Sequence, residues 1–214
     1  MEVEWARLKA YETRQLAEQD TIVILPIAAI EQHGPHLPVM VDSRLVAEVA
    51  RLSAIESNEA GQSAVVLPTI WHGLSEHHME FGGTVTLDMQ TFYLVIRGVI
   101  ESVARHGFSK FMILNGHGGN ITASEIIVDC TDLENCRGPL NLNFLKTGFS
   151  AYRWRSLSHV TDNGVIGDPT SASREKGLQL FEAAAASLSE LIISPETFEA
   201  QNNLRVEKLP NTYK

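Results

Sequence analysis

Carboxylate and imidazole side chains gather directly after the first apolar run of the chain, residues 21–30. Glu31, His33 and His36 follow this run, and Asp42 comes after a turn bracketed by two prolines. Glu31 and His33 are two positions apart, so on an extended backbone they project to the same side. Asp42 precedes a helical pattern and could either cap that helix or reach back to the same point. Such oxygen and nitrogen donors are the ligands of a borderline divalent metal ion.

Two further segments carry side chains of the same kind. A second apolar run, residues 63–70, opens into a loop that contains His72, Ser75, Glu76, His77 and His78. A third run, residues 110–114, leads to His117, which is flanked by Gly116, Gly118 and Gly119. Glycines here would let the backbone pass close to a bound ion or substrate. The three segments together predict a metal site.

Elements that alternate between strand and helix must position these residues. The apolar runs predict strands at residues 21–30, 63–70 and 110–114, with a further candidate at 140–145. Apolar spacing predicts helices at residues 3–18, 43–54, 88–106, 120–130 and 170–193, with Asp88 as an N-cap and Gly107 as a stop signal. This order predicts a three-layer α/β/α fold with a mainly parallel sheet, whose strand ends bring the loops to one rim.

Composition restricts the class of protein. The 214 residues are 44% hydrophobic and 20% charged, which is typical of one globular domain over residues 1–214. We expect residues 194–214 to be a loosely held tail. The net charge of −9, without a basic block, argues against nucleic acid and anionic membranes as partners. Without a signal-peptide pattern or a membrane span we expect a cytoplasmic protein with Cys130 and Cys136 reduced.

Four motifs together resemble the creatininase (creatinine amidohydrolase) family of metal-dependent hydrolases. They are Glu31 to Pro38 with Asp42, Ser75-Glu76-His77 with Phe81 to Thr84, Asn115 to Asn120, and Gly164 to Pro169. The resemblance implies a hydrolase that cleaves a C–N bond of an amide, cyclic amide or formamide through a hydroxide on the metal. It also implies a homo-oligomer, commonly a hexamer. The substrate that the resemblance implies is a small-molecule amide.

The same resemblance implies one or two divalent ions, with zinc expected first and manganese or iron as alternatives. Glu31, Asp42 and His117 would hold one ion, and His33 with a bridging Asp42 would hold the other. The residues expected to line the substrate pocket are His36, Ser75, Glu76, His77, Gly118 and Gly119. We expect His36 to support a ligand or to hydrogen-bond with its loop rather than to ligate. We expect His72, His77 and His78 to line the pocket or the surface. Asp168 beside Pro169 has the pattern of a turn, and Trp154 that of a packing residue or subunit contact.

The chain departs from the family at the second metal position. Creatininases proper have a carboxylate two residues after the histidine that matches His117, where this chain has Gly119. Other members are expected to use a later His-Ala-Gly-Glu segment, which also supplies the catalytic acid or base. Between Asn120 and Gly164 this chain has a single histidine, His159, and no such pattern. The sequence therefore predicts an internal deletion, and no catalytic acid or base is assigned.

Three functions remain open from the sequence. A metal hydrolase is the first, since one ion is enough to activate water and polarise a carbonyl. A non-catalytic relative that binds one metal or acts as an interaction subunit is the second. A dinuclear phosphoesterase is the third and is disfavoured, because the sequence has no evident basic clamp for phosphate.

Overall fold

The computed structural model describes residues 1–121, 156–159, 161–166 and 168–198. The strands are β1 (Ile22–Ile27), β2 (Ala64–Val66) and β3 (Lys110–Asn115), and the α-helices are α1 (Ala10–Ala17), α2 (Val41–Glu59), α3 (Met89–Ala104) and α5 (Arg174–Ile193). Short 3-10 turns connect them: η1 (Trp5–Arg7), η2 (Glu76–Phe81), η3 (Gly118–Asn120), η5 (Leu157–His159), η6 (Pro169–Ser171) and η7 (Pro195–Thr197). The predicted strand at 140–145 lies outside the described residues, as does nearly all of the predicted helix at 120–130.

The three strands form a parallel sheet in the order β2-β1-β3. Val23 of β1 pairs with Val65 on one side and with Phe111 on the other. All six residues of β1 are buried, as expected for a central strand covered on both faces. The predicted parallel sheet is confirmed.

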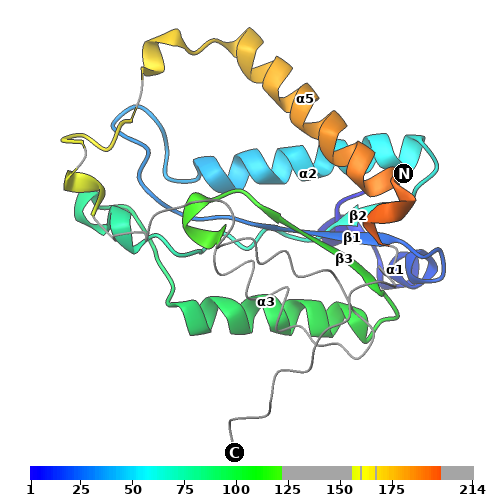
Figure 1. Ribbon diagram of the computed structural model, residues 1–214. Helices are drawn as coiled ribbons and strands as arrows, with labels where there is room; N and C mark the ends of the chain where they lie inside the picture. Colours follow the sequence, from blue (N-terminus) through cyan, green and yellow to red (C-terminus); the bar gives the residue numbers. More distant parts are fainter. Residues whose placement is uncertain (122–155, 160, 167, 199–214) are drawn as a thin grey trace, which may run out of the picture.

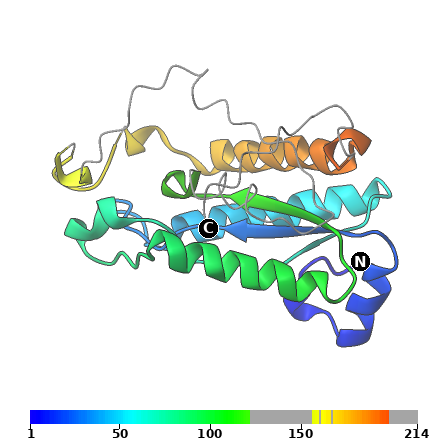
Figure 2. The same cartoon turned by 60° about the horizontal axis from the view of Figure 1, so that its bottom comes forward.

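Helices cover both faces of the sheet. Alternate residues of β1 point to opposite faces, so Val23, Leu25 and Ile27 pack with α1 and α3, whereas Ile22 and Ile24 pack with α2 and α5. Figure 1 shows α3 below the sheet and α2 above it with α5 outermost, and Figure 2 shows the same layers from another side. Two apolar cores thus hold a three-layer α/β/α fold, as predicted.

Several element boundaries differ from the predicted ones. The predicted helix at 3–18 is interrupted, because Val3 accepts a backbone hydrogen bond from Val66 and the chain is extended at Leu8 and Lys9 before α1 begins. The strands at 21–30 and 63–70 are shorter, and their last residues form only isolated bridges, Ile30 with Val85 and Ile70 with Ile27. In the predicted strand at 63–70, Pro68 has no N–H to donate to a neighbouring strand.

Capping side chains and a glycine mark several of the helix ends. Asp88 caps α3 by accepting from the Thr91 N–H at 2.9 Å, and Gly107 follows the helix with φ +98°, as the sequence predicts. The predicted helix at 170–193 starts later, at Arg174, because the Ser173 hydroxyl caps it. Helix α2 spans Val41–Glu59, which is longer than the predicted 43–54 at both ends.

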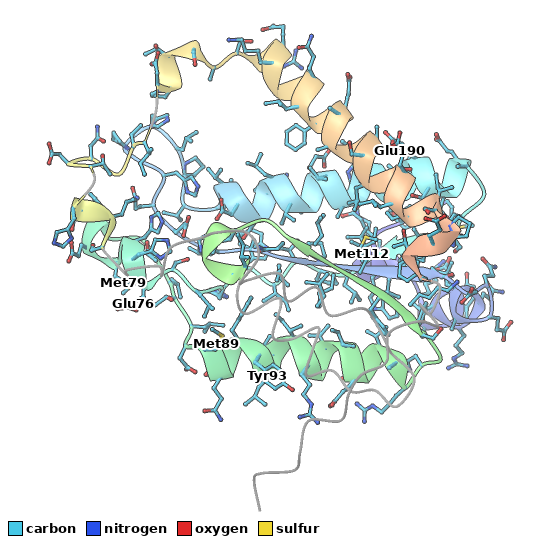
Figure 3. All side chains as sticks on the ribbon, in the orientation of Figure 1. Glu76, Met79, Met89, Tyr93, Met112 and Glu190 are labelled. Carbon is cyan, nitrogen blue, oxygen red and sulfur yellow. The ribbon has the colours of Figure 1, made fainter. Side chains whose placement is uncertain are left out.

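The predicted loose tail begins as an ordered turn. Residues Pro195–Thr197 form η7, and Phe198 packs partly buried against the core between the sheet and α2 and α5. Met112 of β3 packs against the same core (Figure 3). The tail beyond Phe198 lies outside the described residues. None of the described helices has the length and apolar character needed to cross a membrane.

Candidate metal centre

The loops that follow the three strands meet at the carboxyl end of the sheet. Asn120 joins them: its Nδ2 donates to the Ala28 carbonyl at 3.0 Å, and its Oδ1 accepts from the Leu74 N–H at 3.0 Å. Asn120 is fully buried. One amide side chain therefore ties the loop after β3 to the loops after β1 and β2.

The turn after β3 fixes the backbone of His117. The Asn115 side chain accepts from the His117 N–H at 3.1 Å and donates to the His117 carbonyl at 2.8 Å. These two bonds close the turn around His117 and direct its side chain inward, where the residue is only 6% exposed. Asn115, at the end of β3, thus positions His117.

Two buried carboxylates face this histidine. Glu31, after β1, is 4% exposed, and Asp42, in the first turn of α2, is 9% exposed. His117 Nδ1 lies 3.3 Å from Glu31 Oε1 and 3.0 Å from Asp42 Oδ2, while His33 Nε2 lies 3.1 Å from Asp42 Oδ1. Since the N-cap of α2 is Met40, Asp42 does not cap the helix but reaches back to the site.

The carboxylates have unused acceptor capacity. Neither Glu31 Oε2 nor Asp42 Oδ2 has a hydrogen-bond partner among the described residues, although both oxygens are buried. The 3.0 Å contact of His117 with Asp42 Oδ2 is an ion-pair contact that lacks hydrogen-bond geometry. Buried anionic oxygens without partners are costly in a protein interior. A divalent cation among these side chains would remove this cost, so the donors fit a metal ion.

Hydrogen bonds select the tautomers of the two facing histidines. His117 Nε2 lies 3.2 Å from the Leu74 carbonyl, and His33 Nδ1 lies 3.2 Å from the Glu31 carbonyl. A carbonyl oxygen can only accept, so each of these ring nitrogens carries the proton. The other nitrogen of each ring faces the carboxylates and offers a lone pair. Metal-binding histidines commonly have one N–H held in this way.

Without a cation, protonated histidines offset the negative charge of the two carboxylates. Burial alone would lower the pKa of His117, but its contacts with Asp42 and Glu31 outweigh burial and raise the pKa to about 9. For Asp42, burial opposes ionisation, yet the contacts with His117 and His33 lower its pKa to about 2. The contact with Asp42 likewise raises the pKa of His33. The site therefore attracts positive charge.

His78 is a site residue that the sequence interpretation placed only at the pocket or surface. Gln32 Oε1 accepts from the Gly34 N–H at 2.9 Å, so the Gln32 amide group must donate from Nε2 to His78 Nδ1, which is 2.9 Å away. The proton of neutral His78 then sits on Nε2, 3.5 Å from Glu31 Oε2. His78 thus presents an N–H, not a lone pair, to Glu31. No spacing rule distinguishes His78 from the adjacent His77.

The motif around Gly164 supports this hydrogen-bonded chain. Gln32 Nε2 also donates to the Gly164 carbonyl at 3.4 Å. Gly164 has φ +79°, and a Cβ atom there would lie 1.8 Å from Gln32 Oε1. A glycine is therefore required for the loop to pack on Gln32. Asp168, in the same motif, accepts from the Thr170 N–H at 3.0 Å and has the turn role that was predicted.

The residues predicted to line the pocket separate into two groups. Ser75 is buried, and its Oγ lies 3.2 Å from His117 Nε2. His77 is half-buried beside His117. A Cβ at Gly119 would lie 2.2 Å from the Leu74 carbonyl oxygen and 2.5 Å from His117 Nε2. His36, Glu76 and Gly118 are exposed, Glu76 on η2 next to the exposed Met79 (Figure 3). Trp154 lies outside the described residues.

A cavity of about 300 Å³ lies elsewhere. It is lined by residues such as Ile22, Lys110 and Ile192, at the amino end of the sheet. Glu31 and His117 follow the carboxyl ends of the strands, so this cavity is at the opposite end from the candidate metal-binding side chains.

Comparison with known proteins identifies the family. The creatininase model, described as creatinine amidohydrolase, matches residues 6–145. The mycofactocin precursor peptide peptidase of Mycolicibacterium smegmatis is 36% identical over 206 residues, which cover 79% of this chain and 83% of the relative. The creatinine amidohydrolase of Pseudomonas putida is 33% identical over 130 residues, 58% of this chain and 46% of that protein. The chain belongs to the creatininase family.

Solved structures confirm the fold. A manganese form of creatininase superposes with a TM-score of 0.76 at 20% identity, covering 92% of this chain and 99% of that one. A mutant creatininase complexed with creatine gives a TM-score of 0.75 over 90% of this chain. The predicted creatininase-like α/β/α architecture is therefore confirmed, and the family's members are hydrolases.

Proposed function

We propose that this chain is a divalent-metal-dependent hydrolase that cleaves the C–N bond of an amide. The observation that carries the proposal is the pair of buried carboxylates with unpartnered oxygens, which face the lone pairs of two histidines. Four such donors from two different strand ends form a cation site rather than a structural network.

In this proposal Glu31, Asp42 and His117 hold one ion, and His33 and Asp42 hold a second. Asp42 supports a bridging role because each of its oxygens faces a different histidine, at 3.1 Å and 3.0 Å. The mixed oxygen and nitrogen donors suit zinc, with manganese or iron as alternatives. A bound cation would supply a Lewis acid that polarises the amide carbonyl and acidifies water.

The chain itself orients these groups. The Leu74 carbonyl and the Ser75 hydroxyl hold His117 Nε2, so the imidazole cannot rotate away from the carboxylates. Gln32 orients His78, whose Nε2 lies 3.5 Å from Glu31 Oε2. Gly118 and His36 are exposed at the rim, and we propose that they border the entrance for the substrate.

The substrate class follows from the family's hydrolases. Relatives include a peptidase of a precursor peptide, a creatinine amidohydrolase, a 3-dehydro-scyllo-inosose hydrolase and a deformylase that acts on a formylamino-pyrimidine. The peptidase aligns over the largest share of this chain among these four. Peptide amides are therefore the first class to test, followed by cyclic amides and formamides.

A second candidate function is a relative that binds metal without catalysis. The observation that favours it lies at Gly119, where the family's usual carboxylate is missing and a Cβ would collide with the Leu74 carbonyl. Among the described residues, the acids grouped with possible metal ligands are Glu31 and Asp42 alone. A missing acid or base would slow turnover while leaving metal binding intact.

The experiment is a hydrolysis screen on metal-depleted protein reloaded with Zn²⁺, Mn²⁺ or Fe²⁺. The substrates are short peptides, creatinine and formamides, and Asp42→Asn serves as the site variant with Asp162→Asn, an exposed loop acid, as its control. We expect metal-dependent C–N cleavage by the wild type and by the control, and a loss of at least 100-fold in Asp42→Asn. Metal binding without cleavage of any substrate would favour the non-catalytic function.

A further inference from the structure

His77 lies beside two of the proposed metal ligands. One ligand atom each of His77, Glu31 and His117 lie within 4.8 Å of one another. The rings of His77 and His117 stack nearly parallel, with centroids 5.9 Å apart and an interplanar angle of 14°. A ring in this position can present a nitrogen to the same cation as its neighbour.

The ring of His77 makes no hydrogen bond with the described residues, although it is half-buried. His33, His117 and His78 each have a ring nitrogen bound to a carbonyl or an amide. By comparison, neither ring nitrogen of His77 has a hydrogen-bond partner among the described residues. A half-buried imidazole without a hydrogen-bond partner among the described residues, with a ring nitrogen within 4.8 Å of a Glu31 carboxylate oxygen, indicates a missing common ligand.

The other histidines of this loop do not fit the same role. The Gln32 amide occupies the Nδ1 lone pair of His78, and its Nε2 proton faces Glu31. His72 is exposed. Of the three, His77 alone offers a free lone pair near Glu31 and His117.

We propose that His77 is an additional metal ligand, which joins Glu31 and His117 around a divalent cation. Glu31 also belongs to a second group of possible ligands, with His33 and Asp42. It is therefore the residue that the two groups share. His77 would add a nitrogen ligand to the ion that Glu31 and His117 hold in the proposed function. This inference rests on the proposed metal-dependent function.

The test compares His77→Gln with His72→Gln, which changes an exposed histidine of the same loop. Zn²⁺ affinity is measured by competition with a chromogenic chelator, and Co²⁺ binding by visible absorption. We expect His77→Gln to bind Zn²⁺ at least tenfold more weakly and to change the Co²⁺ spectrum, with His72→Gln unchanged. Circular dichroism of the metal-free proteins verifies that both variants fold.

Wild-type affinity and an unchanged Co²⁺ spectrum in His77→Gln would overturn the role of His77 alone. No metal binding by the wild type would instead overturn the proposed function, and His77 with it. The two failures are therefore distinguishable by the wild-type measurement.

A second measurement needs no variant. Diethyl pyrocarbonate modifies free imidazoles, and mass spectrometry locates each modified residue. We expect Zn²⁺ to protect His77 in the wild type while His72 is modified equally with and without Zn²⁺. Equal modification of His77 in both states would overturn the proposal.

Discussion

The tautomers of the histidines decide what each one does in the site. His33 and His117 donate from one nitrogen to a backbone carbonyl and turn the other toward Asp42. His78 does the reverse, because Gln32 donates to it and leaves its N–H for Glu31. Residues of one type therefore serve two purposes, which depend on single hydrogen bonds.

A substitution at His78 should weaken metal binding without removing a ligand. In His78→Ala the Glu31 carboxylate loses the group that orients it, and residues that orient ligands typically change metal affinity 10–100-fold. We expect Zn²⁺ affinity to fall by about tenfold, measured by chelator competition. His106→Ala, at an exposed position after α3, is the control. An affinity equal to that of wild type would show that His78 does not orient Glu31.

The metal-free protein should have a pH optimum of stability below neutrality. The pKa of His117 is raised to about 9 from 6.5, so the stability that its protonation adds is complete below pH 6.5 and is lost as pH rises to about 9. The pKa of Asp42 is lowered to about 2 from 3.8, so its contribution is lost as pH falls from 3.8 to about 2.

Urea unfolding of the metal-free protein tests this pH dependence. We expect maximum stability between about pH 4 and 6.5, with a loss on the order of 2–3 kcal/mol by pH 9. His117→Gln should flatten the alkaline decrease. A stability that is unchanged from pH 6 to 9 would show that the carboxylates do not hold a protonated His117.

At the scale of elements, the loops after the three strands act as one unit. Asn120 joins them through the Ala28 carbonyl and the Leu74 N–H, far apart in sequence but adjacent at the carboxyl end of the sheet. This linkage explains why a buried asparagine ends the motif that carries His117. The arrangement of the strands brings the candidate ligands together, and the asparagine fixes the loops that carry them.

Asn120→Ala should reduce both stability and metal binding. It leaves a buried carbonyl and a buried N–H without partners, which costs about 2–4 kcal/mol in unfolding free energy. Asn58→Ala is the matched control, because Asn58 also bonds two backbone groups, Ala54 and Ala64, but toward the other end of the sheet. We expect urea unfolding to detect a loss in both variants and chelator competition to detect weaker metal binding only in Asn120→Ala. Equal metal affinity in both variants would show that Asn120 does not position the metal site.

The sequence predicted the order of elements and the meeting of Glu31, Asp42 and His117 at one end of the sheet. Periodicity was sufficient for the three strands, and Asp88 and Gly107 marked the ends of α3 through local chemistry. The predicted helix at 3–18 was wrong in its first half, because pairing of Val3 with Val66 is a tertiary contact that no local pattern contains.

The role of His78 could not be predicted for a similar reason. It depends on Gln32, 46 residues away, and on the Gly34 N–H that orients the Gln32 amide. Exposure of His36 and Glu76 was equally hidden, since spacing along a loop does not determine which side chains turn inward. The ligand assignments themselves stay predictions.

At the scale of the whole molecule, two apolar cores hold one parallel sheet between helical layers. The outer surface of α5 retains large apolar side chains, with Leu180 70% exposed and Leu191 55% exposed. They are three helical turns apart and so lie on one side of the helix. Exposed leucines on a common side favour contact with another protein surface.

We therefore expect the protein to self-associate through α5. Leu180→Glu combined with Leu191→Glu should shift the mass measured by light scattering after size-exclusion chromatography toward the 23.6 kDa monomer. Leu94→Glu, on the exposed side of α3, is the control and should leave the mass unchanged. A monomeric wild type, or an oligomer unaffected by the double substitution, would contradict this expectation.

The most direct test of the metal centre is the metal content per chain, measured by elemental analysis after Zn²⁺ loading and gel filtration. Asp42 faces both histidines and is central to the proposed site, whereas Asp88 is an exposed carboxylate that caps α3. We predict one or two ions per chain in wild type and in Asp88→Ala, and none in Asp42→Ala. An Asp42→Ala protein that retains the full metal content, or a wild type without metal, would contradict a metal centre at the carboxyl end of this sheet.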